Sequence, residues 1–184
     1  DVVANGAVVK ADPSGEVCVA FGGSGAIDII WDQVAAVAPA TISAHRPNRV
    51  CDTRQNVDYN TELNQCRGAG HTLAGGQSRV IGYGQPGGAV LGNLTAVPSS
   101  DAAGYVSVFP CAEPALNTSS INLAPGKGVT ANAITVKADY ASAYYGLVCG
   151  AYTGSGWVDL IFDQTAETLG IQPHVPRRLM DTRW

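Results

Sequence analysis

Apolar and polar side chains alternate in several short stretches of the chain, and this period of two is typical of strands with one buried face. The alternation is clear in residues 26–32, 105–109 and 133–137. Between them lie turn signals rich in Gly and Pro, at residues 12–15, 85–88 and 125–128. Short strands interrupted this often predict an all-β fold, an antiparallel β-sandwich of the Greek-key or jelly-roll kind.

Helical composition is confined to residues 32–40 and 163–169, and each stretch is expected to form at most one or two turns. With 22 Gly, 10 Pro and a single Met, the overall composition also favours strands and turns. The length of 184 residues is enough to bury a core. It fits one large β domain, or one and a half smaller ones.

Two segments of the chain recur in the same order at nearly one period, which is the signature of a tandem repeat. Residues 17–33 reappear as 148–164, so that Cys18 corresponds to Cys149 with a shift of 131 residues. Residues 47–54 reappear as 176–183 with a shift of 129 residues. We therefore expect the C-terminal half of one copy at 1–40, a complete copy at 45–168, and the opening strand of a further copy at 175–184.

The two copies differ in the length of one turn. Upstream of the cysteine match, Lys10 corresponds to Lys137, a shift of only 127 residues. The later copy therefore carries four extra residues, in the turn around residues 141–145.

Five cysteines in a chain with few charges favour an oxidising compartment, and hence a secreted or cell-surface protein. The complete copy holds Cys51, Cys66, Cys111 and Cys149, which allow three pairings. Loop chemistry and the repeat favour Cys51–Cys66 with Cys111–Cys149, and they leave Cys18 over. Three accounts of Cys18 remain: the chain is cut from a longer array, a neighbouring molecule completes the first half-copy, or the thiol is buried and free.

The repeated carboxylates Asp28/Asp32 and Asp159/Asp163 are candidates for paired acid–base or calcium chemistry. Residues four apart on a strand lie roughly 13 Å apart, whereas paired glycosidase carboxylates lie about 5–9.5 Å apart. We therefore expect these side chains to be solvated or hydrogen-bonded strand positions.

The triplet Asp52-Thr53-Arg54 returns as Asp181-Thr182-Arg183. Within a strand, Asp and Arg would share one face and Thr would take the other. Such a triplet could recognise a carboxylate. The interpretation we favour is a structural ion pair or hydrogen-bond network that anchors the first strand of each copy to a neighbour.

Other candidate chemistry is sparse. His45, His71 and His174 lie apart and without a Ser or Cys motif beside them, and no cysteine has metal-ligand spacing. We therefore predict no catalytic residue, metal or cofactor. The remaining candidates are aromatic residues that could stack on a sugar: Trp31, Tyr83, Tyr105, Trp157 and Trp184. Of these, Trp31 occupies a core-like strand position.

A net charge of −4 provides no basic surface for nucleic acid. No apolar run is long enough to span a membrane, and residue 1 does not open a signal peptide. We predict neither nucleic acid as a partner nor a membrane span.

Several motifs resemble a module that is repeated in secreted and cell-surface proteins of actinobacteria. That module opens with R-L-L-D-T-R, continues through G-Y-L-T-V-W-P-C, S-N-L-N-Y and A-N-x-V, and closes with V-C-V-Y…T-D-V-I-V-D-V-x-G-Y-F. The matching segments here are 49–54, 104–111, 120–123, 131–134 and 148–163. The chain departs from the pattern at Asp32-Gln33 and Asp163-Gln164. The resemblance implies location and architecture rather than a particular activity.

Together these patterns predict a non-catalytic, extracellular structural or adhesive protein that assembles head-to-tail into a fibre, sheath or surface layer. An unpaired edge strand invites pairing with another chain. We expect the tail strand to pair with the N-terminal half-copy of the same or a neighbouring molecule, through Arg178, Leu179, Asp181, Arg183 and Trp184. The alternative is a carbohydrate- or cell-wall-binding module of a secreted hydrolase.

Overall fold

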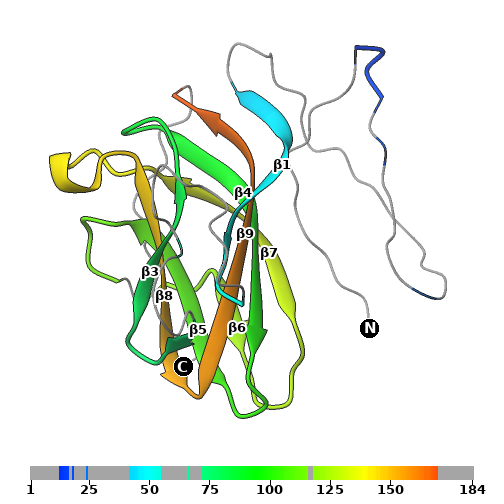
Figure 1. Cartoon of the computed structure of the whole chain (residues 1–184), viewed down its shortest axis with the longest axis vertical. Helices are drawn as coiled ribbons and strands as arrows, with labels where there is room; N and C mark the ends of the chain where they lie inside the picture. Colours follow the sequence, from blue (N-terminus) through cyan, green and yellow to red (C-terminus); the bar gives the residue numbers. More distant parts are fainter. Residues whose placement is uncertain are drawn as a thin grey trace, which may run out of the picture.

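The computed structural model describes residues 13–16, 18, 24, 42–54, 66, 72–115 and 118–169. These residues form an all-β structure with one short 3₁₀ turn, η1 (Ser142–Tyr144), and no α-helix within the described ranges (Figure 1). The strands are β1 (Ser43–Asp52), β2 (Leu73–Ala74), β3 (Ser78–Tyr83), β4 (Ala89–Pro98), β5 (Ala103–Pro110), β6 (Ile121–Leu123), β7 (Thr130–Lys137), β8 (Leu147–Ser155) and β9 (Trp157–Thr168).

The strands form two antiparallel sheets. One sheet has the order β1-β9-β4-β7, and the short β2 pairs with the first residues of β9. The other has the order β3-β8-β5-β6. Every pairing is antiparallel, which agrees with the predicted fold class.

The main hydrophobic core draws buried side chains from both sheets, an arrangement consistent with a β-sandwich. Leu94, Leu160 and Phe162 come from the first sheet, and Ile81 and Tyr152 come from the second; all five are fully buried. Because the two inner faces share one core, loss of either sheet would expose the apolar face of the other.

The predicted strands at 105–109 and 133–137 are confirmed as parts of β5 and β7. The turn signal at 85–88 is also confirmed, because the Gly88 N–H donates to the Gln85 carbonyl at 2.9 Å. The predicted helix at 163–169 is wrong: β9 continues to Thr168. Buried and half-buried residues alternate from Phe162 to Thr168, and pairing with β1 and β4 overrides the helical composition. The stretches 26–32 and 32–40 lie outside the described residues.

Strand β9 holds the first sheet together, because it pairs with β1 on one side and with β4 on the other. The pairing with β1 places Ser43 opposite Glu167 and Asp52 opposite Ile161. The chain therefore enters β1 and leaves β9 at the same end of the sheet. The pairing joins residues more than a hundred positions apart in sequence.

Two glycines make room for the ring of Phe162 at the centre of the core. A Cβ on Gly82, in β3, would lie 2.8 Å from the Phe162 Cε1 atom. A Cβ on Gly92, in β4, would lie 2.5 Å from the ring and 2.7 Å from the Asp163 carbonyl oxygen. Phe162 therefore occupies space that one glycine from each sheet leaves open.

We predict that Gly92→Ala lowers the free energy of unfolding by about 3 kcal/mol, because the new methyl group meets a buried ring and a fixed backbone carbonyl. Gly128→Ala is the matched control, since a Cβ there meets nothing within 4 Å. Its stability should change by less than about 0.5 kcal/mol. Denaturant unfolding of both variants measures the difference, and equal stabilities would contradict this account of the core.

Candidate functional site

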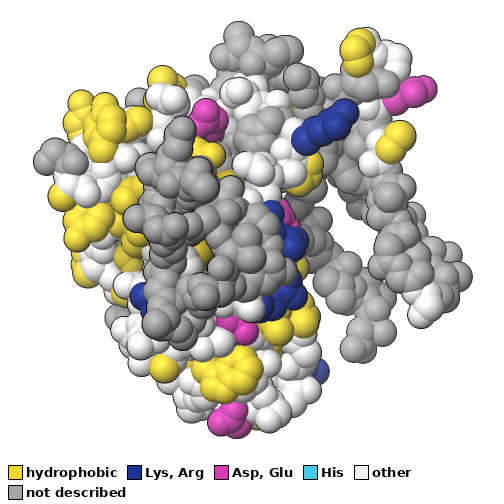
Figure 2. Space-filling view, viewed as in Figure 1, with side chains coloured by type: hydrophobic (Ala, Val, Ile, Leu, Met, Phe, Trp, Pro, Cys, Tyr) yellow, Lys and Arg dark blue, Asp and Glu magenta, His cyan; other side chains and the backbone are white. Residues whose placement is uncertain are grey.

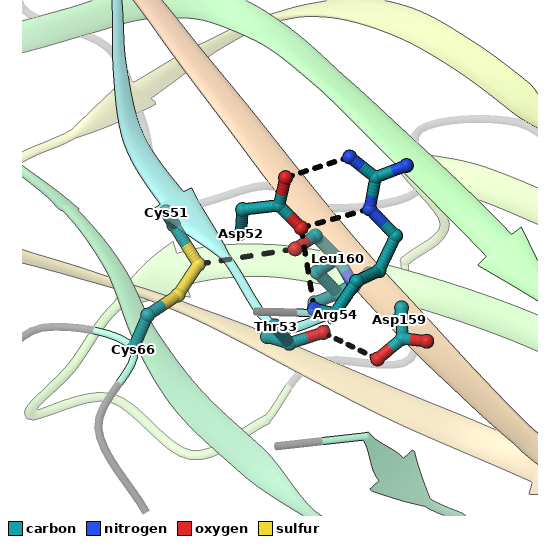
Figure 3. The surroundings of a disulfide bond; sticks show 7 residues. All are labelled: Cys51, Asp52, Thr53, Arg54, Cys66, Asp159 and Leu160. Atoms are coloured by element: carbon teal, nitrogen blue, oxygen red, sulfur yellow. Dashed lines mark hydrogen bonds and ion pairs between the residues drawn. A yellow bond between two sulfur atoms is a disulfide. The ribbon is translucent and has the colours of Figure 1, made fainter. Parts of the chain in front are cut away.

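The densest group of interacting polar side chains joins β1 to β9, and we call it the β1–β9 network. Its members are Arg49, Asp52, Thr53, Arg54, Asp159 and Asp163. Asp52, Thr53, Arg54 and Asp159 lie where β1 ends, beside the Cys51–Cys66 disulfide (Figure 3). Arg49 and Asp163 are paired farther along β1 and β9.

Thr53 extends the pairing with β9 beyond the last residue of β1. Its backbone N–H donates to the Leu160 carbonyl at 2.9 Å. Its hydroxyl donates to Asp159 Oδ1 at 2.8 Å and accepts from the Leu160 N–H at 2.9 Å. Thr53 and Asp159 are both buried. One small side chain thus satisfies buried donors and acceptors that would otherwise cost free energy.

Asp52 carries a fully buried carboxylate, which Arg54 neutralises. The Arg54 guanidinium donates from Nε to Oδ1 at 2.8 Å and from Nη2 to Oδ2 at 2.7 Å, and the Arg54 backbone N–H also donates to Oδ1 at 3.2 Å. This two-point contact is the strong geometry for Arg and a carboxylate. The hydrogen bonds from Arg54 outweigh burial and hold the pKa of Asp52 below its ordinary value.

Arg49 ties β1 to β9 by a second two-point contact. Its Nε and Nη2 atoms donate to Asp163 Oδ1 and Oδ2 at 2.9 and 3.1 Å, and its Nη1 atom lies 3.5 Å from Asp52 Oδ2. The hydrogen bond to Asp163 raises the pKa of Arg49. Arg49 and Asp163 are also directly opposed in the strand register, so side-chain and backbone contacts fix the same alignment.

The structure contains two disulfides, Cys51–Cys66 and Cys111–Cys149, the pairs that loop chemistry and the repeat favour. They close loops with sequence separations of 15 and 38 residues. Loops of this size correspond to about 3 and 4 kcal/mol of stabilisation in the chain-entropy model. Cys18 is exposed and has no disulfide partner within the described ranges. Of the three accounts of Cys18, its exposure disfavours the buried thiol and leaves the other two untested.

The repeated carboxylates of β9 do not face each other in the structure. Asp159 turns to Thr53 and Asp163 to Arg49, so each is occupied by a different residue of the β1–β9 network. Within the described part of the chain, no three His, Cys, Asp or Glu side chains are close enough to hold a metal ion. Asp28 and Asp32 lie outside the described residues, as do Asp181, Thr182 and Arg183.

The aromatic residues expected to form a sugar-stacking platform lie on different elements of the fold. Tyr83 packs against the main core from β3 and Tyr105 is half-buried in β5, whereas Trp157, at the start of β9, is 47% exposed. Trp31 and Trp184 lie outside the described residues. Of the three described members, only Trp157 offers an open ring.

A different aromatic group was missed by the sequence reasoning. Tyr140, Tyr144 and Tyr145 are 71%, 43% and 63% exposed on the β7–β8 loop, which includes η1. Figure 2 shows hydrophobic side chains gathered at the upper left, where Figure 1 places this loop in yellow. The available signal was the four-residue extension, since three of the chain's seven tyrosines fall within six positions there.

Buried contacts hold the β7–β8 loop at its base. The Asp139 carboxylate, on a residue only 4% exposed, accepts from the Ala141 N–H at 2.7 Å and from the Ala112 N–H. At the other end of the loop, the Gly146 N–H donates to the Asp139 carbonyl at 2.9 Å, and the Gly84 N–H donates to the Gly146 carbonyl at 2.8 Å. The tyrosines therefore project from a loop with defined ends.

A small open depression of about 240 Å³ is lined by β7, by Val108 of β5 and by Ser119 and Ser120, which precede β6. Its polar groups already bond one another: Asn132 Nδ2 of β7 donates to the Ser120 carbonyl at 3.0 Å, and Ser120 Oγ accepts from the Val108 N–H of β5 at 3.1 Å. These contacts join the edges of the two sheets, so we assign the depression a structural role.

Comparisons with protein-family models, with curated proteins and with solved structures find no match. Among the described residues, no helix has both the length and the apolar character that a membrane crossing requires.

We predict that Asp52→Asn lowers the free energy of unfolding at pH 7 by about 1–3 kcal/mol, because Arg54 loses its charged partner. Since the folded-state pKa of Asp52 is lowered, its contribution is complete above the unfolded carboxyl pKa of about 4. It disappears as the pH falls through the folded value. The stability difference between the two proteins should therefore shrink below about pH 4.

Urea unfolding at a series of pH values measures this difference. Asp101→Asn, at an exposed carboxylate in the β4–β5 turn, is the matched control and should follow the parent protein throughout. A difference for Asp52→Asn that stays constant down to pH 2 would contradict the assigned role.

Proposed function

We propose that this chain is a non-catalytic extracellular repeat protein with a structural or adhesive role, which assembles by pairing a β1-like strand with a β9-like strand. One observation carries the proposal: both halves of the β1–β9 network occur a second time in the sequence. Residues 178–183 repeat those of β1, and residues 26–33 repeat those of β9.

The correspondence is specific at the positions that form the network. Arg178 and Thr182 correspond to Arg49 in β1 and to Thr53 just after it, and Asp181 with Arg183 repeats the Asp52-Arg54 pair. On the other side, Asp28 and Asp32 stand where β9 has Asp159 and Asp163. A pairing of the two segments would place Arg178 against Asp32 and Thr182 against Asp28. Met180 replaces Cys51, so this second pairing would lack the adjoining disulfide.

The proposal includes a finer description of the fold. Residues 45–168 would be one complete Greek-key or jelly-roll copy, with a partial copy at 1–40 and an opening strand at 175–184. Non-consecutive strands neighbour one another in both sheets, as Greek-key connections require. The equivalent Cys18 and Cys149 support the same division.

An extracellular location is compatible with the two disulfides, because such bonds persist in oxidising compartments. The partner in this proposal is a second copy of the chain or a neighbouring repeat, and the assembly is a fibre, sheath or surface layer. The rival function is a carbohydrate-binding appendage of a secreted hydrolase. That function needs an open sugar site but no strand exchange, so the two are separable by experiment.

Charge reversal tests the pairing of the tail strand. Arg178→Glu should weaken assembly about fivefold, because it places a carboxylate against Asp32. Asp32→Arg should do the same, and the double variant should restore assembly because its charges are again opposite. Light scattering over a concentration series measures the assembled mass, and electron microscopy shows whether filaments form. Lys127→Glu, in the exposed β6–β7 turn, is the control.

If the tail strand pairs within its own molecule, the same variants should lower the melting temperature of a monomer instead of the assembled mass. Deleting residues 175–184 should then have the same effect as the single variants. The assembly proposal fails if the deletion leaves both oligomeric state and melting temperature unchanged.

A further inference from the structure

We infer that the extended β7–β8 loop is a binding platform for an uncharged polysaccharide, in which the rings of Tyr140, Tyr144 and Tyr145 stack on the sugar units. This inference deepens the adhesive role proposed above, and it is independent of strand pairing. It places the sugar site on residues other than the aromatic set expected from the sequence.

The first argument is the exposure of the three rings. Tyrosine buries a large apolar area when it can, yet these three lie 43–71% exposed within six positions. The rings of Tyr140 and Tyr145 have their centroids 6.2 Å apart and are tilted by 49°. They are therefore neighbours that do not cover each other face to face. Open aromatic faces with hydroxyls at their rim match a sugar ring, which offers C–H groups on its faces and hydroxyls at its edge.

The second argument is that the platform is organised before any ligand arrives. Asp139 fixes the start of the loop, and Gly146 fixes its end with φ +80°. A Cβ on Gly146 would lie 2.5 Å from the Gly84 carbonyl oxygen, so this close approach requires glycine. The Cys111–Cys149 disulfide lies nearby, because Ala112 donates to Asp139. A loop whose ends are already fixed loses less conformational entropy on binding than one that must first be ordered.

The third argument is electrostatic and decides the class of sugar. Within residues 138–146 the single charged side chain is Asp139, and its carboxylate is buried against backbone N–H groups. At the same end of the sheet, Lys137 and Glu167 flank β4 with opposite charges. The charges of Asp139, Lys137 and Glu167 sum to −1, and residues 138–146 contain no cation, so the platform fits an uncharged chain better than an anionic one.

The fourth argument is area. Three tyrosines at these exposures offer on the order of 350 Å², whereas a stable protein–protein interface needs about 800 Å² from each partner. The platform is too small for a protein partner of its own, and it suits two or three sugar units. Affinity for one site would be weak, and linked copies in an assembly would raise it.

The partial copy provides an internal comparison. Where the complete copy has residues 139–146, the partial copy has only Asp12-Pro13-Ser14-Gly15 before Glu16. The corresponding segment of the partial copy is thus four residues shorter and contains no tyrosine. The tyrosines of the longer segment are exposed and are not part of the buried core. This is the pattern expected of a binding loop added to a repeated framework.

Depletion binding to three insoluble uncharged polysaccharides, chitin, cellulose and starch, tests the inference. The full chain should be retained by at least one of them. Changing all three tyrosines to Ala should weaken that binding about tenfold or more, whereas the triple Tyr→Phe variant, which keeps the rings, should stay within about threefold. Val129→Ala and Trp157→Ala are matched controls, because both side chains are exposed at the opposite ends of β7 and β9.

Melting temperatures establish that each variant is folded, and Tyr145→Ala alone replaces the triple Ala variant if that one is not. Retention by none of the three polysaccharides would overturn the inference. So would equal losses for the Phe and Ala variants, or loss of binding in Trp157→Ala. A fall in assembled mass in the tyrosine variants would assign the loop to a protein interface instead. Failure of the Arg178 test with sugar binding intact would overturn only the assembly proposal.

Discussion

The described fold depends on holding β1 against β9. Strand β1 covers one edge of β9, and more than a hundred residues separate the partners, so closing this contact costs about 4 kcal/mol of chain entropy. Backbone hydrogen bonds are interrupted by irregular register between Ala44 and Asn48 and between Arg49 and Cys51. The β1–β9 network compensates at the end of the strand, where Arg49, Thr53 and their carboxylate partners add charge-assisted contacts. This concentration of buried polar contacts explains why Asp52-Thr53-Arg54 stands at the end of β1.

The same constraint explains which features were predictable from the sequence. Strands β5 and β7 were predictable because apolar and polar residues alternate along them. This local pattern identifies a strand with one face toward the core, whatever its partner strands are. The end of β9 was not predictable, because residues 163–169 have helical composition and become a strand only through pairing with β1 and β4, which are distant in sequence. The partners of Asp159 and Asp163 were inaccessible for the same reason: strand spacing separates the two carboxylates but does not identify Thr53 and Arg49.

The candidate binding loop shows the opposite case, in which a local signal existed and was given too little weight. The repeat located the extension at residues 141–145, but it was treated as a difference in turn length. The tyrosines are candidates for ligand binding because their rings are exposed. That exposure depends on how Asp139 and Gly146 fix the base of the loop, which the sequence does not show. The sandwich and its β7–β8 loop thus differ in role: buried polar contacts hold β1 against β9, whereas the loop leaves three tyrosine rings exposed.

The position of Ser43 opposite Glu167 has a mechanical consequence. A chain pulled at both sides of this module would load β1 and β9 at adjacent ends, so tension would peel their hydrogen bonds one after another instead of shearing them together. Peeling would stop at Cys51, because the disulfide passes tension directly to Cys66. Residues 52–65 then lie outside the covalent path of the force. The disulfide would therefore keep tension off the buried Asp52–Arg54 and Thr53–Asp159 contacts. Under load, the start of β1 would separate from β9 while these contacts remain in place.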